Sequence, residues 1–146
     1  MFARVTFVTC LVLLLLGPAA KSEEAPGATE NESAAGDTVS KAAQMAERQL
    51  EVARYYMSRR DYIAAINRFK AVATLFSSSS VVDQALFGLM QAYLTLGIHH
   101  EAQAATAVLN RKFPESYWRS EALDILQKAG LEPAEDEKSW ISRAFQ

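Results

Sequence analysis

The feature that most constrains the fold is an internal repeat with a period of 37 residues. Shifting the sequence by this period superimposes identical residues at several pairs of positions, among them Tyr56 and Tyr93, Ala65 and Ala102, Phe76 and Phe113, Ser79 and Ser116, Ala85 and Ala122, and Leu86 and Leu123. Apolar residues within each copy recur at steps of three and four residues, the spacing of an amphipathic helix. One such unit cannot bury its apolar face alone, so successive units stack. The sequence predicts an all-α array of helical hairpins.

Five helices are expected between about Lys41 and Ala129, because polar or glycine-containing breaks divide this region at 58–61, 77–80, 97, 113–116 and 130. Asp61 is placed to cap the second helix, and Ser80 with Asp83 forms a candidate capping box for the third. Residues 41–130 are therefore predicted to form one repeat domain. The last helix of this domain has no second helix to complete its hairpin.

The amino-terminal 20 residues have the pattern of a secretory signal peptide. Arg4 precedes an apolar run from Val5 to Leu16, and small residues follow. An uncleaved membrane anchor is the alternative, although the run is shorter than the roughly 20 apolar residues that a spanning helix needs. Cys10 lies before the run LVLLLL, so an apolar signal residue is favoured over a lipidated cysteine. Residues 21–40 are poor in large apolar side chains and are predicted to be a flexible leader.

Composition argues against several kinds of function. The formal net charge of -2 provides no cationic field for a nucleic acid, so no nucleic-acid partner is expected. No phosphate loop, His-Glu-x-x-His motif or nucleophile elbow occurs, so the chain is predicted to be no enzyme and to need no cofactor. His99 and His100 are the only histidines, and adjacent helical positions diverge by about 100°. A metal site or small hydrolase built on this pair is the weakest hypothesis, and His99 is expected to pack in place of an aromatic residue.

The two units resemble the tetratricopeptide repeat, which places an aromatic residue late in its first helix and a small residue early in its second. The first unit matches this motif at Val52, Ala53, Tyr56, Tyr62, Ala65, Phe69 and Val72, and the second at Leu89, Tyr93, Gly97, Ala102, Leu109 and Pro114. The first unit departs from the motif at its turn, where Arg60 stands in the glycine position. The resemblance implies a protein-binding scaffold.

Three longer strings resemble the carboxy-terminal part of the BamD family, tetratricopeptide lipoproteins of the outer-membrane β-barrel assembly machinery. They are LEVARYYMSRRDYIAAINRFKAV at 50–72, QAYLTLGIHHEAQAATAVLNRKFPESYW at 91–118 and SWISRAF at 139–145. The resemblance implies a non-enzymatic component of, or accessory to, that machinery, in the periplasm and peripherally associated with the outer membrane. The implied partners are proteins, including the periplasmic domains of the barrel component. The alternative is a soluble periplasmic adaptor that coordinates envelope or cell-division proteins.

The repeat fold directs particular positions of each first helix toward a concave groove, where partners would bind. In this sequence those positions are Glu47, Leu50, Arg54, Met57, Ser58, Gln84, Phe87, Gln91, Leu94 and Thr95. Arg59 and Arg60 at the first turn are either solvated or face an acidic partner surface.

Residues 131–146 are predicted to form an acidic linker and a short carboxy-terminal helix. Trp140, Ile141 and Phe145 lie on one side of that helix and are candidates for docking a partner. The alternatives are a cap that folds back over the last unpaired helix, and a membrane contact.

Overall fold

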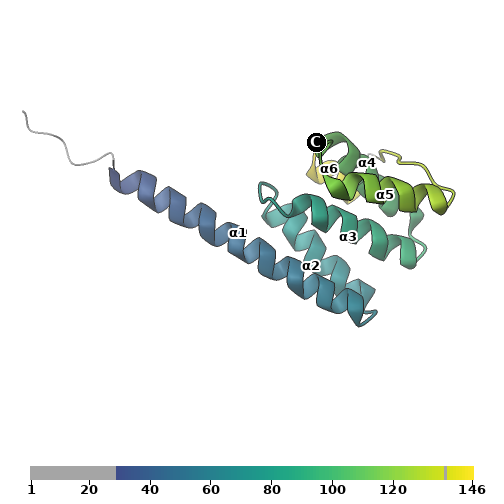
Figure 1. The fold of residues 1–146 in the computed structure, drawn as a ribbon, viewed down its shortest axis with the longest axis horizontal. Coiled ribbons are helices and arrows are strands. Elements are labelled where there is room, and N and C mark those ends of the chain that lie inside the picture. Colours follow the sequence, from purple (N-terminus) through teal and green to yellow (C-terminus); the bar gives the residue numbers. More distant parts are fainter. Residues whose placement is uncertain (1–28, 137) are drawn as a thin grey trace, which may run out of the picture.

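The computed structural model describes residues 29–136 and 138–146, with the side chains described from residue 36 onward. These residues form six helices and no strand (Figure 1). The helices are α1 (Thr29–Ser58), α2 (Tyr62–Leu75), α3 (Val82–Thr95), α4 (His99–Lys112), α5 (Tyr117–Lys128) and α6 (Trp140–Ala144). The predicted all-α array of five helices followed by a short one is therefore confirmed. The predicted signal at 1–20 and the first part of the leader lie outside the described residues.

The helices stack as two complete hairpins and the first helix of a third. Helix α1 pairs with α2 and α3 pairs with α4, while α3 also packs on α2 and α5 packs on both α3 and α4. The second helix of each hairpin has a small residue on the side that faces the first helix. These residues are Ala65 in α2 and Ala102 in α4, and both are fully buried. Small side chains at a crossing let the two helix axes approach closely. The core that results is continuous from α1 to α5.

Helix α1 begins earlier than the sequence predicted. We expected helical structure from about Lys41, whereas α1 begins at Thr29, within the segment predicted to be a flexible leader. Extending a helix that is already packed adds one hydrogen bond per residue without a new nucleation cost. Residues 36–42 are exposed, as expected for a segment without a large apolar face. Figure 1 shows this part of α1 projecting beyond the rest of the array.

Helices α1, α3 and α5 end in the same way. Asp61 N–H donates to the Tyr56 carbonyl at 3.0 Å, and the equivalent bonds join Ile98 to Tyr93 and Leu131 to Leu126. These are Schellman motifs, which need a left-handed residue directly after the helix. That residue is Gly97 in the second turn and Gly130 in the third, but it is Arg60 in the first.

The predicted caps are right for α2 and wrong for α3. Asp61 caps α2, because its carboxylate accepts a hydrogen bond from Ala64 N–H at 3.1 Å. The residue that precedes α3 is Val81, which has no capping side chain, so the predicted capping box of Ser80 and Asp83 is not formed. The Asp83 carboxylate instead accepts a hydrogen bond from the Ser116 hydroxyl at 2.6 Å. Since Ser116 caps α5, Asp83 joins the start of α3 to the start of α5.

The carboxy-terminal segment, residues 131–146, folds back on the array and packs helix α6 against α4. Ser139 caps α6 and donates a hydrogen bond to the Glu101 carboxylate at 2.6 Å. Trp140 Nε1–H donates to the Tyr93 hydroxyl at 3.0 Å, and the Lys70 ammonium lies 4.5 Å from the centre of the Trp140 ring. Helix α4 is therefore covered by α3, α5 and α6, which explains why seven of its fourteen residues are buried.

Candidate partner-binding groove

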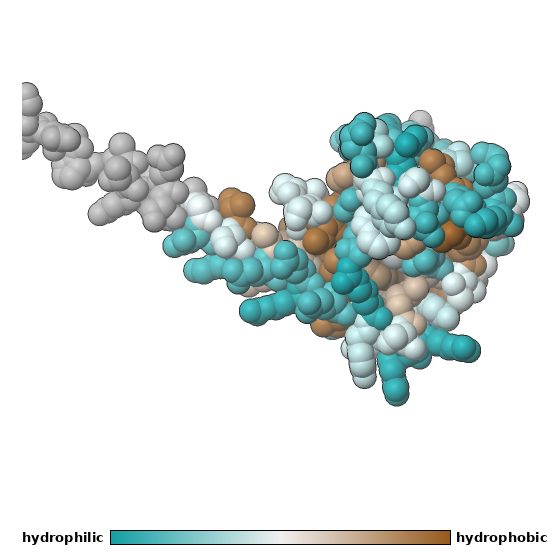
Figure 2. Space-filling view, viewed as in Figure 1, coloured by the Kyte–Doolittle hydropathy of each residue, from teal (hydrophilic) through white to brown (hydrophobic). Residues whose placement is uncertain are grey.

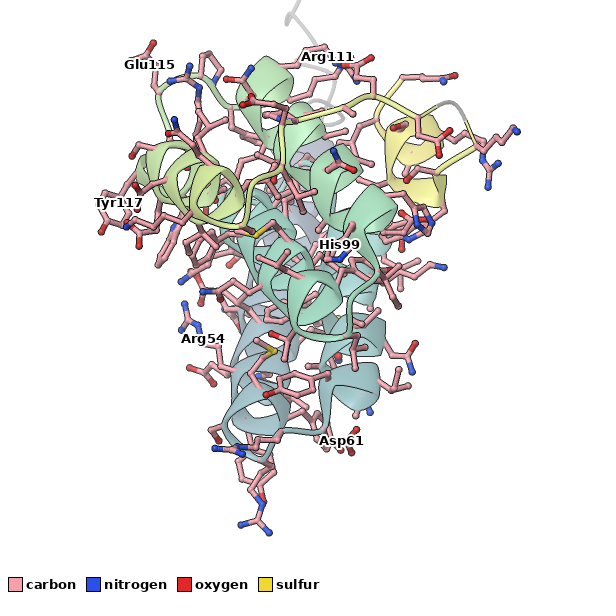
Figure 3. All side chains as sticks on the ribbon, turned by 90° about the vertical axis from the view of Figure 1, so that its right-hand side faces the viewer. Arg54, Asp61, His99, Arg111, Glu115 and Tyr117 are labelled. Carbon is pink, nitrogen blue, oxygen red and sulfur yellow. The ribbon has the colours of Figure 1, made fainter. Side chains whose placement is uncertain are left out.

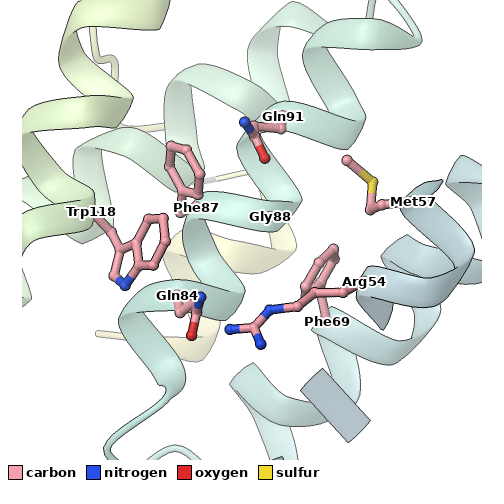
Figure 4. A pocket seen from close by; sticks show the side chains of 8 residues that line it. All are labelled: Arg54, Met57, Phe69, Gln84, Phe87, Gly88, Gln91 and Trp118. Carbon is pink, nitrogen blue, oxygen red and sulfur yellow. The ribbon is translucent and has the colours of Figure 1, made fainter. Parts of the chain in front are cut away.

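A concave pocket of about 280 Å³ opens on the side of the array formed by α1, α3 and α5. Its lining residues are Arg54 and Met57 from α1, Phe69 from α2, Gln84, Phe87, Gly88 and Gln91 from α3, and Trp118 from α5 (Figure 4). All three first helices of the hairpins therefore contribute to it. Figure 2 shows hydrophobic surface where α1 meets the rest of the array.

The apolar part of the pocket is aromatic. The rings of Phe87 and Trp118 lie 4.9 Å apart between centroids and are tilted by 36°, so they form one continuous wall. The Phe69 ring reaches the pocket from the second helix of its hairpin because Gly88 leaves room for it. A Cβ atom added to Gly88 would overlap that ring. Rigid aromatic side chains of this kind contribute much of the binding energy at protein interfaces.

The rim of the pocket is polar. The side chains of Arg54, Gln84 and Gln91 border the aromatic wall, and Arg54 and Gln84 extend toward each other across the opening (Figure 4). The Arg54 guanidinium is exposed and makes no ion pair with any side chain that the structure describes. The pocket can therefore accept an apolar side chain of a partner while the guanidinium binds a neighbouring carboxylate.

The structure brings five of the ten predicted groove residues together at this pocket, namely Arg54, Met57, Gln84, Phe87 and Gln91. Leu50 is only 3% exposed and belongs to the core, so its predicted place on the groove surface is wrong. Glu47, Ser58, Leu94 and Thr95 do not line the pocket. Ser58 and Thr95 instead donate hydrogen bonds to carbonyl groups of their own helices, those of Tyr55 and Gln91.

Three pocket residues were not predicted, namely Phe69, Gly88 and Trp118. Phe69 matches the repeat motif and is a core residue that is only 3% exposed. Its ring reaches the groove only because the residue packed against it is a glycine. No spacing rule within one helix reveals such a contact, because it depends on how α2 and α3 are placed relative to each other.

The carboxy-terminal residues predicted to dock a partner are engaged within the chain itself. Ile141 is fully buried and Phe145 is 8% exposed, so neither presents a surface to another protein in this structure. Trp140 is half-buried and makes the contacts with Tyr93 and Lys70 described above. The segment folds back, as the capping alternative predicted, but it packs on α4 and not over the open side of α5. Figure 3 shows Arg54 and Tyr117 on one side of the molecule and α6 on the other.

The two histidines lie at the surface. His99 and His100 are both exposed, so the predicted packing of His99 in place of an aromatic residue is wrong. The described residues contain no group of three or more His, Cys, Asp or Glu side chains placed to hold a metal ion. None of the helices in the described part of the chain is long and apolar enough to span a membrane.

Comparison with known proteins finds similarity over the repeats. The YfiO family of outer membrane lipoproteins matches residues 38–109, a region that runs from α1 into α4. An outer membrane protein assembly factor BamD from Caulobacter vibrioides is 40% identical over 91 residues, which are 62% of this chain and 30% of that protein. The BamD of Rickettsia prowazekii is 32% identical over 83 residues, covering 57% of this chain and 33% of the relative.

The chain thus spans about a third of the length of the relatives that it matches. No solved structure matches it significantly. The matched residues cover most of both hairpins and include every pocket-lining residue except Trp118. We conclude that residues 38–109 of this chain are similar to the YfiO family of outer membrane lipoproteins, and that the chain resembles part of the BamD proteins.

Proposed function

We propose that this chain is a non-enzymatic protein-binding component of the outer-membrane β-barrel assembly machinery, or an accessory to it. The relatives are named as outer membrane protein assembly factors, and the family as outer membrane lipoproteins. The single observation that supports binding by this chain is the concave pocket, because it is built from the hairpins that match the family.

The proposed partners are other proteins of the assembly machinery, including the periplasmic domains of the barrel component. A partner would place an apolar side chain against Phe87 and Trp118 and a carboxylate beside the Arg54 guanidinium, which makes no ion pair with any described side chain. The proposed location is the periplasm, with peripheral association with the outer membrane. The alternative of a soluble adaptor for envelope or division proteins is not favoured, since the matched relatives share the name of an assembly factor.

Co-purification with matched variants tests this proposal. The full chain is expressed in Caulobacter vibrioides, the source of one of the relatives, recovered from envelope extracts in mild detergent, and probed for components of the assembly machinery. Arg54→Glu reverses the charge at the pocket without disturbing the core, because Arg54 is exposed. Arg143→Glu makes the same change at an exposed residue of α6 outside the pocket lining.

We expect assembly components to be recovered with the natural chain and with Arg143→Glu, and to be lost with Arg54→Glu. Recovery of no assembly component with the natural chain would overturn the proposed function. Equal recovery with Arg54→Glu would overturn the pocket as the place of binding.

A further inference from the structure

A second surface, on a side of α1 outside the pocket lining, combines apolar and basic residues in one line. Lys41, Met45, Arg48, Val52, Tyr55 and Arg59 follow one another at steps of four, three, four, three and four residues, so they lie along one side of the helix. We name them the α1 stripe. All six are exposed, including Met45 at 53% and Tyr55 at 60%.

The repeat shows what this side of the helix does elsewhere in the same array. Shifting the α1 stripe by 37 residues gives Ser78, Val82, Ala85, Leu89, Ala92 and Leu96. The four central residues of that set are fully buried, because this is the side by which α3 packs on the preceding hairpin. The α1 stripe is therefore the side on which the array would continue, and no described part of the chain covers it.

The charges on the α1 stripe are all positive. Lys41, Arg48 and Arg59 make no ion pair with any described side chain. At 100° per residue, the acidic residues Glu47 and Glu51 lie toward the groove side of the helix, with Arg54. Basic side chains here replace residues such as Ala85, which is buried in the equivalent position of α3. A partner that packs on this side must supply negative charge to compensate them.

We propose that the α1 stripe docks an acidic amphipathic helix of another protein. The apolar residues of that helix pack on Met45, Val52 and Tyr55, and its carboxylates pair with Arg48 and Arg59. The neighbouring surface of α2 suits a helix, because Ala64 and Ala71 flank Arg68, which bonds to Gln49 beside the α1 stripe. Both alanines are half-buried, and small residues allow a second helix to approach closely.

Two other occupants fit less well. A helix that lies on a membrane has its cations at the borders of the apolar face, where they reach water and lipid headgroups. Here Arg48 is in line with Met45 and Val52, so a bilayer that buried them would bury the guanidinium as well. A second copy of the chain would bring two basic stripes together in a symmetric dimer, and like charges oppose that contact.

A labelled synthetic helix tests the proposal with the full chain. The probe carries leucines at the a and d positions of a heptad and glutamates at e and g, and a matched probe carries lysines in place of the glutamates. Fluorescence anisotropy measures their binding to the natural chain, to Arg48→Glu/Arg59→Glu and to Arg54→Glu. We expect the natural chain and Arg54→Glu to bind the acidic probe, and the double variant to bind it at least about tenfold more weakly.

The lysine probe should show the reverse preference and bind the double variant better than the natural chain. Equal binding of both probes to the natural chain, or no binding of the acidic one, would overturn the proposal. Binding of the natural chain to phosphatidylglycerol vesicles but not to the acidic probe would also overturn it and indicate a lipid surface. Concentration-dependent self-association that the double variant abolishes would indicate a second copy in its place. Because the proposed function is tested by Arg54→Glu, the two proposals can fail separately.

Discussion

Arg60 and Gly97 occupy the same turn position in successive repeats, and both adopt a left-handed backbone with φ values of 62° and 74°. Each follows a helix and donates its N–H to a carbonyl three residues earlier, that of Met57 or Leu94. Glycine adopts this conformation without strain, whereas an L-residue with a Cβ atom costs about 1–2 kcal/mol there. The first turn therefore holds strain that the second turn lacks.

Replacing Arg60 with glycine should stabilise the fold. We expect Arg60→Gly to raise the free energy of unfolding by about 0.5–1 kcal/mol, because relief of the strained φ exceeds the greater freedom of glycine in the unfolded chain. Gly97→Ala should lower it by about 1 kcal/mol for the opposite reason. Urea denaturation followed by circular dichroism measures both. A loss of stability in Arg60→Gly would contradict this account of the turn.

Gly88 should be intolerant of any side chain. The Cβ atom of alanine would overlap the Phe69 ring, which is 3% exposed and has little room to move. We expect Gly88→Ala to lower the free energy of unfolding by about 1–3 kcal/mol, although alanine favours helix more than glycine does. Thermal and urea unfolding report the change.

Gly36→Ala is the matched control, since Gly36 is exposed in α1 and a Cβ atom there meets nothing within 4 Å. It should stabilise the chain by up to about 1 kcal/mol. Replacing the Phe69 ring with the smaller side chain of leucine should reduce the loss of unfolding free energy that Gly88→Ala causes in the double variant. Additive effects of the two substitutions would show that the overlap does not determine the cost.

The bond between Trp140 and Tyr93 should couple the carboxy-terminal segment to the repeats. In a double-mutant cycle, Trp140→Phe and Tyr93→Phe each remove one partner of the 3.0 Å hydrogen bond. We expect a coupling free energy of about 0.5–1.5 kcal/mol. A parallel cycle of Trp140→Phe with Tyr55→Phe should show none, because Tyr55 lies on the exposed side of α1. Coupling near zero in the first cycle would mean that the segment does not hold this position in solution.

Tyr93 should also make the stability depend on pH in the alkaline range. Burial raises the pKa of its hydroxyl above the ordinary value of 10.0, the hydrogen bond from Trp140 lowers the pKa in part, and Glu101 raises it. The folded state therefore favours the protonated hydroxyl. Its contribution to stability is complete below pH 10.0 and is lost as the pH rises from there through the raised pKa. We expect Tyr93→Phe to flatten the decline in unfolding free energy above pH 10.0, whereas Tyr55→Phe should leave it steep.

Several pocket residues could be predicted from the sequence, because their side of the helix depends only on spacing within that helix. The spacing of Met57 in one first helix and of Phe87 and Gln91 in the next placed them on the groove side, and the pocket includes all three. The same reasoning failed for Leu50, which is buried. The repeat motif generally directs this position toward the groove. Whether a residue there is exposed or buried depends on the helices that pack around it. Phe69 became a pocket residue for the same kind of reason, through its contact with Gly88.

The sequence by itself determined the array, because a 37-residue period and a three- to four-residue apolar spacing leave stacked amphipathic helices as the arrangement that buries those side chains. It also determined the turns and the cap at Asp61, which depend on residues adjacent in the chain. Only the tertiary structure decided that Trp140 and Ser139 bond to Tyr93 and Glu101, contacts that span 47 and 38 residues. Only the tertiary structure likewise left the α1 stripe exposed while its counterpart on α3 is buried. Burial depends on which neighbour is present, and helical spacing within one segment carries no information about that neighbour.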